Sequence, residues 1–253
     1  MDEFSVSILQ IASSGSVTER VERARRLAAS AEDASDVILL PELWTGESSG
    51  HDTALALDAI SEICSDMGCF AVTGGMPWEE DGTRVLRTWI VDDRGCRHSF
   101  TDKAHLSSKS GEGGIYSRGE THAIFNIGET TAAAVSAYDL MFPEYCRQLS
   151  LAGARIFFVS ASWPLQFGYA WDFVLQGAAF TNQVYVAACN GAASPGHFCG
   201  NSALVSPWGN IIERLGEDEN ALTRSFRLSE IKKCKKCMPV EHDRRIDIYR
   251  LLS

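Results

Sequence analysis

Short, wholly apolar segments that alternate with amphipathic ones constrain the fold of this chain most strongly. Residues 37–40 read Val-Ile-Leu-Leu, which is typical of a strand buried on both faces of a sheet. A capping box at residues 16–19 predicts a helix after the first strand, and the second half of the chain also begins with a strand and a helix. The sequence therefore predicts an α/β fold, a four-layer αββα sandwich in which two mixed sheets pack face to face with helices outside.

Periodicity and turn residues set the expected elements. Strands are expected at residues 4–11, 37–40, 69–74, 85–91, 97–100, 156–160, 184–188, 203–206, 211–213 and 222–226. Helices are expected at residues 17–31, 55–63, 144–152 and 171–181. The last three strands are expected to be antiparallel around a turn at residues 207–210. No repeat, linker or low-complexity tract interrupts the chain, so we expect a single domain over residues 1–253.

The overall charge argues against two classes of partner. The chain has 253 residues and a formal net charge of −10, which disfavours nucleic acid and anionic membranes as partners. It has no run of 18 apolar residues, and two of its first four residues are acidic where a signal peptide is basic. These features predict a cytoplasmic protein. Its eight cysteines are scattered, as is typical of reduced thiols rather than a disulfide scaffold.

Residues 135–144 carry the most informative motif. They read Val-Ser-Ala-Tyr-Asp-Leu-Met-Phe-Pro-Glu, and Pro143 fits the first turn of a helix, where its missing N–H costs nothing. The pattern predicts a strand, a tight turn and a helix. It resembles the nucleophile elbow of the nitrilase (carbon–nitrogen hydrolase) superfamily, Cys-Tyr-Asp-x-x-Phe-Pro-Glu. In this sequence Ala137 occupies the place of the cysteine nucleophile.

Two further segments resemble the catalytic motifs of that family. Residues 39–44 read Leu-Leu-Pro-Glu-Leu-Trp, and the resemblance makes Glu42 the general base that takes the proton of the nucleophile. Residues 102–106 read Asp-Lys-Ala-His-Leu, and the resemblance gives Lys103 the stabilisation of an oxyanion, together with the backbone N–H of Tyr138. The histidine in this segment, His105, is expected to be a hydrogen-bonded core residue.

A glycine-rich loop supplies the second acid of the resemblance. Glu112 lies seven residues before Gly119, as a second glutamate does in the family, with Tyr116 in the aromatic place and Arg118 in place of a proline. Glu112 would hydrogen-bond Lys103 and orient the substrate amide. Without the proline, the loop is expected to be less rigid.

The resemblance covers nearly the whole chain. Supporting segments lie at residues 160–164, 200–209 and 243–249, and matching residues run from Gln10 to Tyr249. One departure is at residues 177–182, where the family usually has an Arg and a Glu. The resemblance implies the αββα arrangement, no cofactor, and a homodimer joined through the helix after the elbow and the C-terminal segment.

The substrate implied by the resemblance is a small-molecule amide. Aromatic residues near strand ends are expected to wall a narrow pocket, namely Trp44, Tyr138, Phe142 and Trp163, and Tyr116 is a further candidate for binding the substrate. Arg118 and His197 are candidates for binding a substrate carboxylate. Hydrolysis of a small linear amide to acid and amine is the main interpretation, and a nitrilase, an N-carbamoyl amide hydrolase and an acyl transferase are the alternatives.

Alanine at position 137 offers no nucleophile, so the chain as given is predicted to be inactive. Three interpretations are open: an engineered Cys→Ala replacement, a natural non-catalytic amide-binding homologue, and use of another nucleophile. Ser136 is expected to face the opposite side of its strand, and Cys146 is expected to lie too far along the helix.

The pair of cysteines in Cys234-Lys235-Lys236-Cys237 is the other chemical motif. Zinc normally requires a second pair of ligands, and His242 is the only later histidine. We therefore predict no metal site and interpret the motif as a solvated basic turn that carries two thiols.

Overall fold

Two six-stranded sheets form the centre of the protein. The computed structural model describes residues 2–30, 35–47, 50–122, 124–193 and 197–249. The first sheet has the order β12-β1-β2-β3-β4-β5, and the second has the order β11-β10-β9-β8-β7-β6. The strands are β1 Glu3–Gln10, β2 Val37–Leu39, β3 Phe70–Glu80, β4 Thr83–Val91, β5 Arg97–Asp102, β6 Ile124–Ile127, β7 Thr130–Ser136, β8 Ile156–Ala161, β9 Tyr185–Asn190, β10 Ala203–Val205, β11 Ile211–Arg214 and β12 Asn220–Arg227.

The two sheets repeat one pairing pattern. In the first, β2 is parallel to both β1 and β3, and the outer pairs β12–β1, β3–β4 and β4–β5 are antiparallel. In the second, β8 is parallel to both β7 and β9, and the pairs β6–β7, β9–β10 and β10–β11 are antiparallel. The parallel strands at the centre of each sheet are almost entirely buried.

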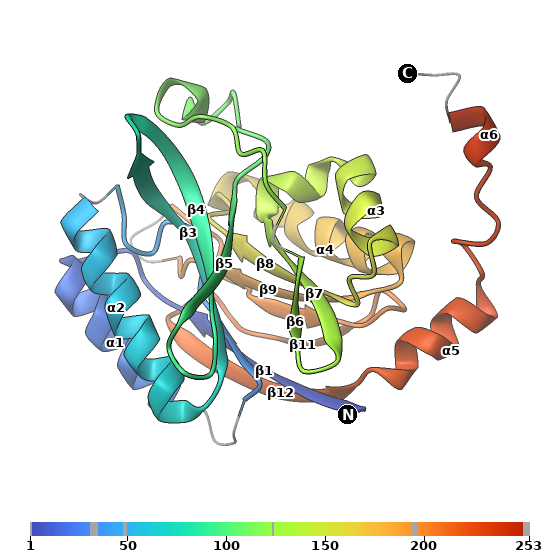
Figure 1. Cartoon of the computed structure of the whole chain (residues 1–253), viewed down its shortest axis with the longest axis horizontal. Helices are drawn as coiled ribbons and strands as arrows, with labels where there is room; N and C mark the ends of the chain where they lie inside the picture. Colours follow the sequence, from blue (N-terminus) through green and yellow to red (C-terminus); the bar gives the residue numbers. More distant parts are fainter. Residues whose placement is uncertain (1, 31–34, 48–49, 123, 194–196, 250–253) are drawn as a thin grey trace.

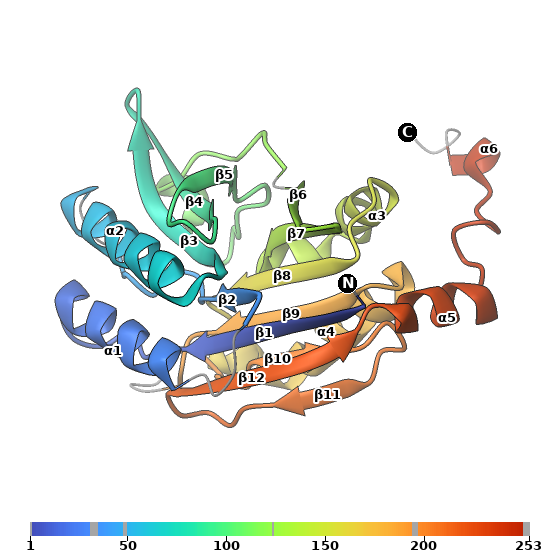
Figure 2. The same cartoon turned by 60° about the horizontal axis from the view of Figure 1, so that its bottom comes forward.

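Helices cover the outer face of each sheet (Figures 1 and 2). The helices are α1 Val17–Ala29, α2 Gly50–Met67, α3 Pro143–Leu151, α4 Gly168–Asn182, α5 Ser229–Cys237 and α6 Ile246–Tyr249, with 3-10 turns η1 Glu112–Gly114, η2 Ala137–Met141 and η3 Leu165–Phe167. One apolar core lies between the sheets, a second between α1, α2 and the first sheet, and a third between α3, α4 and the second sheet. The predicted αββα sandwich of two mixed sheets is confirmed.

Several elements differ from the sequence-based expectation. Strand β3 continues to Glu80 because it forms a long hairpin with β4, and helix α2 starts at Gly50. The edge strand β6 was not predicted. It has only four residues and pairs only with β7. The expected antiparallel pairing of the last strands is confirmed for β10 and β11 but is wrong for β12, which pairs with β1 in the other sheet.

The Cys234–Cys237 motif lies on helix α5 rather than in a turn. Cys234 is buried, where its thiol contacts the carbonyl of Pro207, and Cys237 is exposed. The interpretation as a solvated turn is therefore wrong for Cys234. The described residues contain no cluster of three or more His, Cys, Asp or Glu that is suited to a metal ion. Among the same residues, no helix is long and apolar enough to cross a bilayer.

Candidate active site

Glu42 lies where the carboxyl ends of central strands from the two sheets meet. It follows β2, and its backbone N–H donates to the carbonyl of Ala161, the last residue of β8, at 3.1 Å. The next residue, Leu43, has a left-handed φ of 56° and donates its N–H to the Gly75 carbonyl. Gly74 permits the close approach of β3, since a Cβ there would lie 1.9 Å from the Pro41 oxygen. The backbone on both sides therefore fixes the Glu42 side chain, which is 3% exposed.

Lys103 bridges two carboxylates at the end of β5. Its Nζ lies 3.1 Å from Glu42 Oε1 and 2.8 Å from Glu112 Oε1, and only 4% of the side chain is exposed. Burial alone would lower the pKa of Lys103, but the charges of the two glutamates raise it above its ordinary value. Lys103 is therefore held as an ammonium ion between two acids.

Glu112 is fixed by its own loop. While one carboxylate oxygen contacts Lys103, the other accepts the backbone N–H of Ser107 at 2.7 Å. The Glu112 N–H in turn donates to the Ser107 carbonyl, and Gly111 takes a left-handed φ of 72°. These contacts give the glycine-rich loop a defined conformation around the acid.

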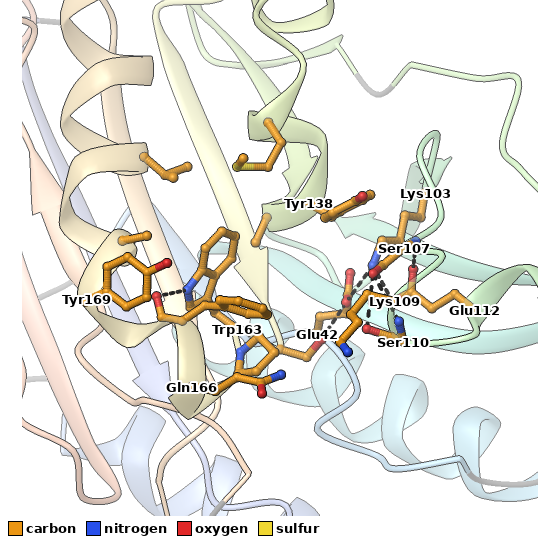
Figure 3. Close-up of a pocket in the computed structure, with 17 residues that line it drawn as sticks. Glu42, Lys103, Ser107, Lys109, Ser110, Glu112, Tyr138, Trp163, Gln166 and Tyr169 are labelled. Carbon is orange, nitrogen blue, oxygen red and sulfur yellow. Dashed lines mark hydrogen bonds and ion pairs between the residues drawn. The ribbon is translucent and has the colours of Figure 1, made fainter.

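The predicted elbow forms around Ala137. Strand β7 ends at Ser136, the turn η2 follows, and α3 starts at Pro143, so Ala137 begins the turn and is 4% exposed. The ring of the next residue, Tyr138, has its centroid 6.0 Å from Lys103 Nζ. Figure 3 shows Tyr138, Lys103 and Glu112 on the same side of the pocket.

His105 supports the turn from behind. Asp139 accepts both the backbone N–H of His105, at 2.8 Å, and a contact with its Nδ1, at 2.7 Å. Burial raises the pKa of Asp139, and the hydrogen bonds from His105 oppose that shift. The imidazole also stacks on Phe142, with 3.7 Å between ring centroids. These contacts match the hydrogen bonding predicted for His105, but the side chain is 32% exposed and is not a core residue as predicted.

Two serines that the motifs did not single out complete the surroundings of Glu42. Ser136 Oγ donates to Oε2 at 2.6 Å, and Ser162 Oγ donates to Oε1 at 2.7 Å. Ser136 does face away from Ala137, as strand alternation predicts, but the opposite face of the strand is where Glu42 lies. Cys146 is buried in α3, where burial raises its pKa to about 12, so it is no substitute nucleophile.

The charged cluster opens into a pocket of about 540 Å³. The pocket is lined by Glu42, Lys103, Ser107, Lys109, Ser110, Glu112, Ala137, Tyr138, Met141, Ser162, Trp163, Pro164, Gln166, Phe167, Tyr169, Ala170 and Val174. Charged and polar groups form one end, and apolar side chains from η3 and α4 form the opposite wall (Figure 3). Such a space holds a small molecule with a polar reacting end.

Of the five aromatic residues predicted to contact the substrate, the structure places Tyr138 and Trp163 in the pocket lining. Trp44 is 1% exposed in the core under α1 and α2, where its indole N–H donates to the Thr73 carbonyl. Tyr116 points its hydroxyl at Glu47 instead, and Phe142 stacks on His105. Arg118 and His197, predicted as carboxylate ligands, are exposed and are absent from the lining. The apolar wall of the pocket comes mainly from residues 163–174. The 3-10 turn η3 in this segment follows Trp163-Pro164, and its sequence has no helical periodicity that would have predicted it.

The chain is similar to known proteins in both sequence and structure. The profile of the carbon-nitrogen hydrolase family matches residues 5–236. The chain belongs to the carbon–nitrogen hydrolase family. The 2-oxoglutaramate amidase of Bacillus subtilis is 28% identical over 258 residues, covering 98% of this chain and all of that protein.

Two solved structures of this family show the same fold. A carbon–nitrogen hydrolase from Helicobacter pylori superposes with a TM-score of 0.90 at 19% identity, over 99% of each chain. A double mutant of the Nesterenkonia sp. AN1 amidase, solved in complex with acrylamide, superposes with a TM-score of 0.86 at 20% identity, over 99% of this chain and 97% of that one.

Replacing Ser136 with alanine is expected to lower the free energy of unfolding by about 2 kcal/mol, because the buried carboxylate of Glu42 loses one of its donors. Urea denaturation measures the change. Ser108→Ala is the matched control at an exposed serine of the loop, where we expect a change within about 0.5 kcal/mol. Equal losses in the two variants would contradict the role assigned to Ser136.

Proposed function

We propose that this member of the carbon–nitrogen hydrolase family binds a small linear amide beside Ala137, in a site built for amide hydrolysis by a cysteine at that position. The observation that carries the proposal is the Lys103 ammonium, held between two carboxylates in the pocket that Ala137 lines. Buried charges are costly to maintain without a use. The amidase activity named for the Bacillus subtilis relative supports the substrate class.

In a variant with cysteine at position 137, each residue of the site would have a separate role in the reaction. Glu42 takes the thiol proton, and the sulfur attacks the amide carbon. Lys103 and the backbone N–H of Tyr138 stabilise the oxygen anion, and ammonia or an amine leaves with a proton. Water then attacks the thioester carbon, which releases the acid and restores the thiol. Glu112 orients the amide and holds Lys103 in place.

With alanine at position 137, the chain has no sulfur to form the thioester, and we propose that it binds the amide without turning it over by this route. The acrylamide complex of the Nesterenkonia amidase mutant, a protein of the same fold, supports binding without turnover. A natural amide-binding homologue is therefore the second candidate, and Ala137 itself is the observation that favours it. Ammonia release by an Ala137→Cys variant separates the two. A folded variant that hydrolyses no member of a panel of short amides favours the binding protein.

We also propose that two copies of the chain associate through α3 and the C-terminal segment. A groove between α3, α4 and that segment is lined by Met141, Phe173 and Tyr249, which are 50%, 75% and 47% exposed. The segment itself extends away from the sheets (Figure 1). Apolar side chains gathered in this way are typical of an interface between subunits.

Sedimentation is therefore expected to show a dimer that Phe173→Asp converts to a monomer at micromolar concentration, because a charge would be buried in the interface. Leu55→Asp is the matched control, since Leu55 is 40% exposed on α2, on the other side of the molecule. A monomer for the unmodified chain at all concentrations would contradict the proposed dimer.

A further inference from the structure

The pocket has a cation at its outer end that the reaction does not use. Lys109 lies in the loop between Ser107 and Glu112, is exposed, and lines the same pocket as the catalytic cluster. Within the described part of the chain it has no hydrogen bond or ion pair. Hydrogen bonds fix the loop that carries it. The Ser107 N–H donates to the Glu112 carboxylate, the Glu112 N–H donates to the Ser107 carbonyl, and the Ser110 N–H donates to Ser107 Oγ.

The charges of the pocket are arranged asymmetrically. At its inner end one ammonium ion contacts two carboxylates, so a net charge of −1 remains there. Lys109 is the only exposed charged residue of the described lining, and the two acids of that lining, Glu42 and Glu112, both contact Lys103. A substrate with one anionic end is therefore repelled from the inner end and attracted to the outer one.

Two neutral side chains with donor groups also line the pocket. Gln166 and Tyr169 line the same pocket from η3 and α4, both are exposed, and neither side chain has a hydrogen bond to another described residue. Figure 3 shows the Lys109 side chain extending toward the side of the pocket where Gln166 lies. An ammonium group with an amide donor on the side toward which it extends suits the oxygens of a carboxylate.

We propose that Lys109 is the specificity-determining residue of this pocket and selects short linear amides that carry a carboxylate at the end opposite the amide. The inference rests on the proposed function, since it assumes that the amide reaches the Glu42–Lys103 end. Lys109 and Gln166 then replace Arg118 and His197 as the groups that face the carboxylate. Their role is to fix which end of the substrate enters first.

Equilibrium binding to the unmodified chain tests the inference without interference from turnover. The probes are the monoamide of a five-carbon dicarboxylic acid and the neutral five-carbon amide of the same length. We expect the anionic probe to bind about fivefold more tightly than the neutral one, the range of an exposed ion pair. The preference should shrink as ionic strength rises, because salt screens exposed charges.

Lys109→Met is expected to abolish the preference and to leave binding of the neutral probe unchanged. Lys236→Met is the matched control, because Lys236 is an exposed lysine of α5 outside the pocket lining, and it should keep the preference. Lys109 is exposed, so its replacement should not affect folding, which a thermal melt verifies. Equal binding of the two probes to the unmodified chain, or an unchanged preference in Lys109→Met, would overturn the inference.

Kinetics in an Ala137→Cys background distinguish this inference from the proposed function. There, Lys109→Met should raise KM for the anionic amide about fivefold with kcat unchanged, since the contact acts equally on bound substrate and transition state. If the Ala137→Cys enzyme is active and its KM is the same with and without Lys109, the inference is overturned and the proposed function stands. An inactive Ala137→Cys variant whose binding still depends on Lys109 contradicts the hydrolytic function and supports the inference.

Discussion

Replacing Ala137 with cysteine is expected to give the chain amidase activity, with kcat/KM rising by at least about 10⁴-fold over the unmodified protein for its best amide. The alanine side chain lines the pocket that contains Glu42 and Lys103, so a thiol at that position would meet a base and a cation. A thiolate attacks an amide carbon, whereas a methyl group cannot. Ammonia release from a panel of short amides measures the change.

The controls for this gain keep the fold and alter only the chemistry. Ala137→Ser adds a hydroxyl instead of a thiol and should give far less activity, because a hydroxyl is a weaker nucleophile near neutral pH. Glu42→Gln in the cysteine form should abolish activity, because it removes the proton acceptor. A mass increase equal to the acyl group, seen during turnover, would identify the thioester. Full activity in the Glu42→Gln form would contradict the assignment of the general base.

The same panel decides between the alternative reactions. Nitriles and N-carbamoyl amides included beside simple amides test the nitrilase and carbamoyl-hydrolase interpretations. Activity of the unmodified chain that disappears in Ser162→Ala would instead identify a hydroxyl nucleophile, because Ser162 lines the pocket within 2.7 Å of Glu42. The outcomes therefore distinguish the alternative substrates and the alternative nucleophile from amide hydrolysis by a cysteine at position 137.

The fold was predictable because its determinants are local. A buried central strand such as β2 is visible as an uninterrupted apolar run, and the elbow at Pro143 is visible as a turn followed by a helix start. Strand pairing between distant segments is not local. The partnership of β12 with β1 joins residues more than two hundred positions apart, and no turn between them indicates it.

The acids and the lysine of the site were predicted by motif, and the structure brings Glu42, Lys103 and Glu112 into contact. The pocket wall was less predictable, because an aromatic side chain near a strand end can face either the core or the site. Trp44 faces the core, where its indole N–H finds the carbonyl of Thr73, and Trp163 faces the pocket. Lys109 gave no signal in the sequence, since an exposed lysine in a loop is common and only the pocket gives it a role.

Removing the ammonium of Lys103 is expected to be the most damaging single change to the site. In the cysteine form, Lys103→Ala should abolish activity, with a loss of at least about 10²-fold to 10³-fold for the missing oxyanion donor alone. It also leaves Glu42 and Glu112 as buried acids without their shared partner. We expect the free energy of unfolding to fall by about 3–5 kcal/mol, as for other broken buried ion pairs.

Stability measurements separate these two effects. Lys103→Met keeps most of the side-chain volume, and adding Glu112→Gln removes one of the stranded charges. The double variant should therefore recover part of the lost stability and none of the activity. Activity in a folded Lys103→Ala enzyme would contradict the oxyanion role, whatever its stability.

The pH dependence of the Lys103 contribution has a definite sign. The pKa of Lys103 is raised in the folded protein above its ordinary value of 10.5, so the folded state retains the proton more strongly than the unfolded state. Its stabilisation is complete below pH 10.5 and is lost as the pH rises through the folded-state pKa. Urea denaturation of the unmodified chain and Lys103→Met should therefore show a constant difference from pH 7 to about pH 9.5 and a smaller one above about pH 10.5. A difference that grows with pH in this range would show that Lys103 is not held as a cation by its two acids.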